Sequence, residues 1–287
     1  MKSHESRIFS LKNPNYHYSF KTRESKSYQV NNSMASKFAE NLNRVKGKLE
    51  ESLTQSGQLE IQQYINFKID RKSKKMPNLN LFKEEIESRG LNVIFLADSS
   101  LSMTYAYNNL RNISATIFKA LEKCPFINFE VISYSGLGGG QYSDHHVKLQ
   151  EIKKLEDCKY ISADHSDRLT PTDLSLEYAW QKIRKLEGKK LVILFTDGYP
   201  EDSVYDMNEM YDKVKKQIVK MQNDKINFFT IYFQNYTYCG KSEVDNQITP
   251  YMRKLFKNTM YQSSDFKQIE KIIHKNLIKS IERLNQN

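Results

Sequence analysis

Three oxygen-bearing side chains stand two residues apart in the stretch Leu91–Met103, LNVIFLADSSLSM. Asp98, Ser100 and Ser102 provide one carboxylate and two hydroxyls. Hard oxygen ligands of this kind, held on one tight loop, suit a small hard cation such as Mg²⁺. The same residue types also cap helices, so the spacing alone leaves two interpretations open: a metal site, or the start of the next helix.

The residues just before this triplet predict the element that positions it. Leu91–Ala97 is an almost wholly apolar run, rich in Val, Ile and Phe, that follows Arg89 and Gly90. Such a run predicts a strand that is buried on both faces of a sheet. In open parallel α/β sheets, ligands bind at the carboxyl ends of strands, which is where Asp98 would lie.

Two later stretches repeat this arrangement of an apolar run and a polar turn. Leu191–Pro200, LVILFTDGYP, predicts another buried strand, and it ends in Asp197. Between the two strands, Leu169–Ala179, LTPTDLSLEYA, is a threonine-rich turn that opens a helical pattern. Strands that alternate with helices form mostly parallel sheets with right-handed crossovers, so the three polar loops should gather at one edge of the sheet.

The pattern D-x-S-x-S-M after one strand, T-P-T before a helix and T-D-G-x-P after a later strand resembles the von Willebrand factor A domain. The resemblance implies an α/β fold with a doubly wound, mostly parallel central sheet. It also implies a metal-ion-dependent adhesion site in which three loops provide the ligands. The positions that match these ligands are Asp98, Ser100 and Ser102 in the first loop, Thr170 in the second and Asp197, which often acts through water, in the third.

The second loop offers two threonines for one ligand position. Thr170 is preferred over Thr172 because it stands six residues before Leu176, as the family pattern places it. Asp173 is then expected to cap the following helix. Mg²⁺ is the expected ion, with Mn²⁺ or Ca²⁺ as alternatives. Two hydroxyls and one direct carboxylate leave such an ion with surplus positive charge, so an acidic side chain of a protein partner could complete the site.

The region before Leu91 resembles one branch of this family in its layout. A helical segment, then S-G-x-L at Ser56–Leu59, a basic loop and the first domain strand are similar to the intracellular branch with the large cobalt-chelatase subunit and the nitric-oxide-reductase activation protein. Leu101 departs from the Gly that is frequent in that branch, without removing a ligand. The branch commonly works beside a MoxR-type or chelatase-type AAA+ ATPase, so the resemblance implies such a partner. An unrelated helical extension is the alternative.

The charge of the chain is uneven. Its formal net charge is +10, and residues 1–90 hold 17 Lys and Arg against 10 Asp and Glu. A basic segment can bind nucleic acid, an acidic partner or a membrane surface, and it can also serve solubility alone. A nucleic-acid-associated scaffold that uses this basic region is therefore the alternative function to a Mg²⁺-dependent protein-binding module.

Targeting and cysteine patterns bear on the compartment. The first 20 residues contain no apolar signal-peptide core, and no stretch reaches the ~18 consecutive apolar residues of a membrane span. Cys124, Cys158 and Cys239 are odd in number and widely spaced, so they predict neither a disulfide framework nor a zinc site. We therefore expect a cytoplasmic protein with reduced thiols.

Catalytic residue sets are not evident. A D-x-D-x-T phosphatase loop would need a second carboxylate at Ser100, and a two-metal hydrolase would need more carboxylates than Asp98 and Asp197. His145 and His146 are adjacent, and adjacent side chains on a strand point apart, which disfavours a shared metal. The sequence predicts that the protein is not an enzyme.

The chain divides into three predicted parts: a basic polar N-terminal segment (1–32), a helical extension (33–90) and the von Willebrand A-type domain (91–287). Apolar periodicity and turn residues predict their elements. Helices are expected at 33–54, 59–67, 105–123, 173–187, 202–221 (N-cap Asp202 or Ser203), 250–256 and 266–284; further strands at 79–82 and 146–152 (both edge strands), 127–134, 226–233 and 260–261; a loop at 234–249; and a mobile hairpin or bulge at Gly136–Gly140.

Overall fold

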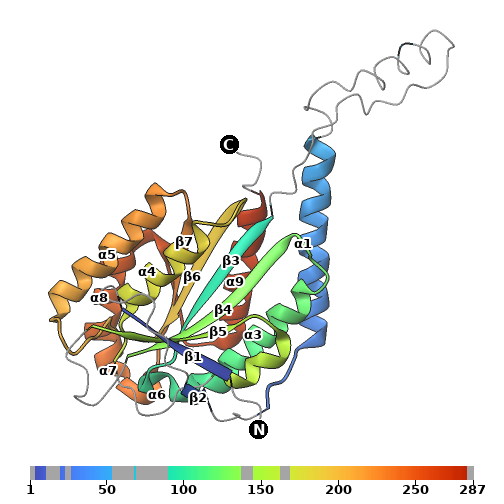
Figure 1. Ribbon diagram of the computed structural model, residues 1–287. Coiled ribbons are helices and arrows are strands. Elements are labelled where there is room, and N and C mark those ends of the chain that lie inside the picture. Colours follow the sequence, from blue (N-terminus) through green and yellow to red (C-terminus); the bar gives the residue numbers. More distant parts are fainter. Residues whose placement is uncertain are drawn as a thin grey trace.

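A twisted sheet of eight strands forms the centre of the computed structural model, which describes residues 4–10, 20–22, 27–53, 68, 90–136, 145–161 and 169–282 (Figure 1). Their order in the sheet is β2-β1-β5-β4-β3-β6-β7-β8. The strands are β1 (His4–Phe9), β2 (Phe20–Thr22), β3 (Leu91–Asp98), β4 (Ile127–Ser135), β5 (Val147–Ile152), β6 (Lys189–Thr196), β7 (Asn227–Phe233) and β8 (Met260–Ser263).

The strand directions confirm the predicted mostly parallel α/β sheet. β3 pairs in parallel with β4 and β6, and the parallel arrangement continues through β7 to β8. β5 and β1 add antiparallel strands on the other side of β4, followed by β2. All eight residues of β3 are buried, as expected for the central strand of a sheet that is covered on both faces.

Helices cover both faces of the sheet (Figure 1). Alternate residues of β3 point to opposite faces, so Phe95 and Ala97 lie in one apolar cluster while Ile94 and Leu96 lie in the other. The first cluster includes residues of α1 (Asn32–Leu53), α3 (Tyr107–Leu121) and α9 (Phe266–Glu282), and the second includes residues of α4 (Thr172–Ile183), α5 (Met207–Asn223) and α8 (Thr249–Phe256).

Shorter helical turns connect these elements. They are η1 (Leu101–Ala106), η2 (Leu155–Tyr160), α6 (Tyr236–Cys239), α7 (Lys241–Glu243), η3 (Val244–Ile248) and η4 (Lys257–Thr259). The segment 234–249, predicted as a loop, therefore contains three of them. In the part of the chain that the structure describes, no helix is both long enough and apolar enough to cross a membrane.

The N-terminal part contributes to the same core. The predicted helix at 33–54 is confirmed as α1, whose residues Phe38, Ala39 and Leu42 are buried beside α3 and α9. β1 pairs with the free side of β5, so the prediction of an edge strand at 146–152 was wrong. The polar sequence before residue 32 gave no alternation strong enough to predict that strand. The boundaries at residues 33 and 91 stay a prediction.

Two helix ends differ from the expectation. α5 begins at Met207 rather than at residue 202, because Asp206 accepts the backbone N–H groups of Asn208 and Glu209 while the Glu209 side chain accepts that of Asp206. The predicted N-cap at Asp202 or Ser203 was therefore wrong. α4 ends at Ile183, earlier than predicted. The predictions at 59–67 and 79–82, and most of the glycine run at 137–140, fall outside the described residues.

Candidate metal site

The first loop starts where β3 ends. Asp98 and Ser100 are fully buried, and Asp98 Oδ1 accepts the backbone N–H of Ser100 at 2.9 Å. The side chain of Ser100 makes no capping bond to η1; its Oγ lies 3.1 Å from Ser102 Oγ. The interpretation that these residues merely cap the next helix is therefore not supported, since α3 also begins without a side-chain cap at Ala106.

The third loop brings Asp197 to the first. Ser102 Oγ donates to Asp197 Oδ1 at 2.8 Å, and Thr196 Oγ1 donates to Asp98 Oδ2 at 2.6 Å. Because Ser102 uses its only hydroxyl hydrogen on Asp197, Ser100 must be the donor in the Ser100–Ser102 contact. The structure thus joins four of the five predicted site residues, Asp98, Ser100, Ser102 and Asp197, at the carboxyl ends of β3 and β6.

The second loop is held by backbone bonds. Thr170 and Glu201 exchange two backbone hydrogen bonds of 2.9 Å, which tie the second loop to the third. Gly136 N–H donates to Leu169 O at 2.7 Å, and a Cβ at Gly136 would lie only 2.4 Å from Leu169 Cβ. Glycine is therefore required where the end of β4 meets this loop.

The two threonines of the second loop differ in their surroundings. The hydroxyl of Thr172 lies 3.3 Å from both the Tyr134 hydroxyl and the Thr170 carbonyl, and Thr172 is 1% exposed. The Thr170 hydroxyl has no hydrogen-bond partner among the described residues, although Thr170 is 5% exposed. This contrast favours Thr170 as a ligand, but in the described part of the chain no hydrogen bond joins it to the other four residues.

Two residues that the sequence analysis missed complete the surroundings. Asn235 Nδ2 donates to Asp197 Oδ2 at 2.8 Å and to the Ser102 carbonyl at 2.7 Å. The Tyr107 hydroxyl contacts the backbone carbonyl groups of the first loop. Asn235 follows the buried strand β7, so the reasoning that found Asp98 and Asp197 at strand ends could have found it. Nothing in the sequence signals Tyr107, whose position depends on how α3 packs.

Burial and like charge dominate the electrostatics of the site. Burial raises the pKa of Asp98. Burial, together with the charge of Asp98, raises the pKa of Asp197 to about 7, against the opposing hydrogen bonds from Asn235 and Ser102. Among the described residues, no Lys, Arg or His side chain forms an ion pair with either carboxylate. Two buried acids therefore face each other without a protein cation between them.

The residues present fit a small divalent ion. The Ser100 hydroxyl receives no hydrogen bond in the described chain, so its lone pairs remain available, as do those of Thr170. All candidate ligands are hard oxygens, and an ion would supply the positive charge that the two carboxylates lack. No described cluster contains three or more His, Cys, Asp or Glu side chains placed to hold a metal. The donor set is thus one of hydroxyls and two carboxylates, unlike that of a zinc site.

The expectation for Asp173 was wrong. The N-cap position of α4 is Pro171, and Asp173 lies inside the first turn, where its Oδ2 contacts His145 Nε2 at 2.8 Å. His145 belongs to the chain entering β5, which runs antiparallel to β4, and this places its ring at the same edge of the sheet as the three loops. This contact depends on tertiary structure and has no local sequence signal.

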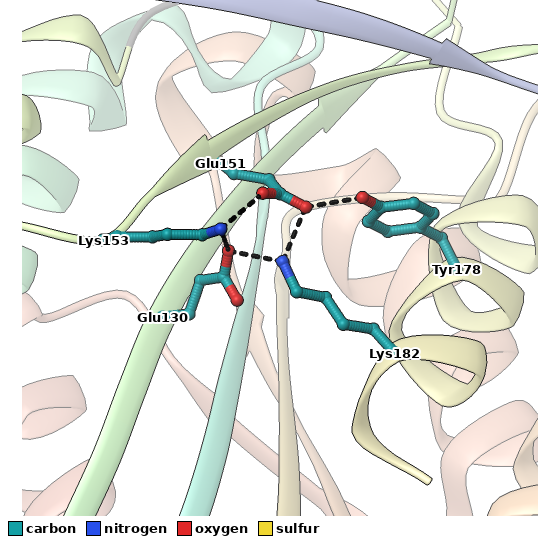
Figure 2. A network of polar contacts seen from close by, with 5 residues as sticks. All are labelled: Glu130, Glu151, Lys153, Tyr178 and Lys182. Carbon is teal, nitrogen blue, oxygen red and sulfur yellow. Dashed lines mark hydrogen bonds and ion pairs between the residues drawn. The ribbon is translucent and has the colours of Figure 1, made fainter. Parts of the chain in front are cut away.

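A second acidic cluster lies away from these loops, between the sheet and α4. Figure 2 shows Glu130 of β4 and Glu151 of β5 sharing the ammonium group of Lys182, whose Nζ lies 2.6 Å from each carboxylate. Lys153 and the Tyr178 hydroxyl also contact Glu151. Because both carboxylates are neutralised by lysine, we assign this network to structure rather than to catalysis.

Comparison with known proteins identifies this arrangement of sheet and loops. A family model described as the von Willebrand factor type A domain matches residues 92–275. The chain is also similar to the pilus adhesin SpaC from Lactobacillus rhamnosus GG, with a TM-score of 0.53 at 12% identity over 71% of this chain and 32% of the adhesin. An open conformation of that adhesin gives a TM-score of 0.52 at 13% identity over 70% and 31% of the two chains.

These likenesses differ in what they show. The family model covers more than half of the chain and extends over the whole of the region that holds the three loops. This chain spans only about a third of the adhesin's length, and the low identity shows a shared fold alone. A comparison with curated protein sequences found no match.

Proposed function

Because this chain belongs to the von Willebrand factor type A family, whose domains are typically protein-interaction modules, we propose that it is a non-catalytic, Mg²⁺-dependent protein-binding module. Domains of this family often bind a metal ion at the loops described above. The proposal assigns that site to Asp98, Ser100, Ser102, Thr170 and Asp197.

One observation carries the proposal: the buried carboxylates of Asp98 and Asp197 are connected through Ser100 and Ser102 and have no basic partner in the described residues. Asp98 is fixed by Thr196 and by the Ser100 N–H, and Asp197 is fixed by Asn235, so both carboxylates are already oriented. When bound, the ion would supply a positive charge and a coordination position for a carboxylate of the partner. Asn235 and Thr196 hold the acids in place around it.

The ion is tested by the melting temperature of the protein in EDTA and in increasing Mg²⁺. At about 100-fold excess of Mg²⁺ over its dissociation constant, the wild-type protein should gain about 2.7 kcal/mol. Asp98→Asn keeps the shape of the side chain but removes one ligand charge, so it should lose this gain. Asp212→Asn, an exposed change on α5, should keep it. Equal responses from Asp98→Asn and the wild type would refute the site.

The second-loop ligand is tested in the same way. Thr170→Val removes a hydroxyl that has no hydrogen-bond partner among the described residues, so it should weaken the Mg²⁺ response with little effect on stability in EDTA. Thr172→Val removes a hydroxyl that contacts Tyr134, so it should lower stability in EDTA and leave the Mg²⁺ response in place. The opposite result would assign the ligand to Thr172.

For the partner, we propose an AAA+ ATPase of the MoxR or chelatase type in the cytoplasm, with this protein as the adaptor to the ATPase's target. The support is the sequence layout before Leu91, which resembles that of the intracellular branch of the family. The contact should depend on both the ion and Asp98, because the ATPase would provide the carboxylate. Capture from native lysate in Mg²⁺ should enrich such an ATPase, and EDTA or Asp98→Asn should abolish the enrichment. Capture that neither treatment changes would contradict this partner.

A further inference from the structure

His145 lies between two carboxylates from different parts of the chain. Its Nε2 is 2.8 Å from Asp173 Oδ2 in the first turn of α4, and its Nδ1 is 2.7 Å from Asp202 Oδ2 in the third loop. The three side chains are 9%, 3% and 4% exposed, respectively. The ring of Tyr205 packs against the imidazole edge to face, with 5.0 Å between the ring centroids.

This geometry favours a positively charged imidazole. Nε2 makes a hydrogen bond with Asp173, whereas Nδ1 lies within ion-pair distance of Asp202 but has no hydrogen-bond partner of good geometry among the described residues. Two buried carboxylates this close to one ring favour the positively charged imidazolium. Burial by itself lowers the pKa of His145, but the neighbouring carboxylates of Asp173 and Asp202 outweigh it and raise the pKa to about 9. The other described groups that face this cluster are Tyr205 and Lys213, whose Nζ lies 3.8 Å above the Tyr205 ring.

The two carboxylates belong to the same pair of loops as the candidate ligands. Asp173 stands three residues after Thr170, and Asp202 stands five residues after Asp197. The backbone exchange between Thr170 and Glu201 already joins these loops, and His145 joins them a second time through side chains. Asp173 Oδ1 is buried and has no hydrogen-bond partner among the described residues, so His145 is the charged contact that compensates the burial of Asp173.

We propose that His145 is a positioning residue that, as an imidazolium, clamps the second loop to the third and so fixes Thr170 relative to Asp197. The effect on ion binding rests on the function proposed above, whereas the clamp itself does not. Removal of His145 would leave Asp173 and Asp202 facing a gap with two like charges, and the loops would separate.

The clamp is tested first without any metal. In the wild-type protein, NMR of the histidine ring nitrogens should show both nitrogens of His145 protonated at pH 7.5, with a midpoint near 9. Asp202→Asn leaves one carboxylate and should lower this midpoint towards 6.5. In His145→Gln, hydrogen exchange at the amides of Thr170 and Glu201 should be at least about 10-fold faster, because those bonds would open locally more often. His146→Gln, a change at the neighbouring histidine, is the matched control.

The second arm measures Mg²⁺ affinity by calorimetry. His145→Gln should weaken binding by about 10- to 100-fold, the usual effect of groups that orient metal ligands, and His146→Gln should not. A midpoint near 6.5 in the wild type, or unchanged exchange in His145→Gln, would overturn the clamp. Equal Mg²⁺ affinities of His145→Gln and the wild type would overturn the role of His145 in ion binding but would not contradict the cation site. If the wild type binds no Mg²⁺, the proposed function fails while the ring and exchange measurements still decide the clamp.

Discussion

Asn235 shows how much of the site depends on residues outside the metal-ligand motif. It is 2% exposed, and its amide donates to both Asp197 and the Ser102 carbonyl. Asn235→Ala would remove the donor to the buried Asp197 carboxylate and to the part-buried Ser102 carbonyl, together with the side-chain cap of α6, which costs about 1–3 kcal/mol. We therefore expect urea unfolding at pH 7 to show a loss of this size.

The matched control is Asn246→Ala, because Asn246 is exposed and contacts only the Ser242 hydroxyl among the described residues. That change should lie within about 0.5 kcal/mol of the wild type. A loss of the same size in both variants would show that the two hydrogen bonds of Asn235 do not stabilise the site.

At the scale of elements, the network of Figure 2 connects α4 to β4 and β5. Burial alone raises the pKa of Glu151, but the hydrogen bonds from Lys182 and Tyr178 outweigh it and lower the pKa to about 2. The pKa of Glu130 is raised, because burial there outweighs the same lysine. Both acids contact Lys182 and Lys153, so they titrate as a coupled pair.

Lys182→Met removes the lysine that contacts both Glu130 and Glu151, each 12% exposed, and leaves the more exposed Lys153, which lies 3.1 Å from Glu151 and 3.9 Å from Glu130. We expect a loss of about 3 kcal/mol at pH 7, since a partly buried ion pair without one partner is strongly destabilising. Because the pKa of Glu151 is lowered on folding, its stabilising contribution is present above pH 4.5 and is lost as the pH falls towards 2. The difference between variant and wild type in urea unfolding should therefore shrink at pH 4.

The exposed Lys185 of the same helical region provides the control. Lys185→Met should leave the free energy of unfolding nearly unchanged at both pH values. A loss for Lys182→Met that does not vary between pH 7 and pH 4 would show that packing of the lysine stem, rather than its charge, stabilises this junction.

At the scale of the whole molecule, α1 and α4 lie on opposite faces of the sheet but share the strands between them. Leu42 of α1 is fully buried, so Leu42→Ala should cost about 2–5 kcal/mol. The single tryptophan of the chain, Trp180, lies in α4. If the loss of stability at α1 reaches the opposite face of the sheet, tryptophan fluorescence and far-ultraviolet circular dichroism should report one unfolding transition, shifted to lower stability by the same amount.

Lys37→Ala, an exposed change on the same helix, should leave both transitions in place. A Leu42→Ala protein in which circular dichroism shows an early transition while tryptophan fluorescence does not would mean that α1 unfolds separately. That outcome would support the division of the chain at residue 91 into a helical extension and a domain.

The sequence by itself determined the central strands and the chemistry at their ends. Buried strands of a parallel sheet are short and apolar on both sides, so β3, β6 and β7 could be predicted from local composition alone. A polar residue directly after such a strand lies at the carboxyl edge of the sheet, which is why Asp98 and Asp197 could be predicted to lie close together. The structure places both there. Their role as metal ligands stays a prediction.

Tertiary structure decided the features that join residues far apart in the chain. β1 pairs with β5 across more than a hundred residues, and its polar sequence has no pattern strong enough to predict a strand. His145, Asp173 and Asp202 meet only because the entry to β5, the first turn of α4 and the third loop converge at one edge of the sheet. Local periodicity reports which face of an element is buried, whereas the partner of a charged side chain depends on how the elements pack. The protonation of His145 follows from that packing and from nothing in its neighbouring residues.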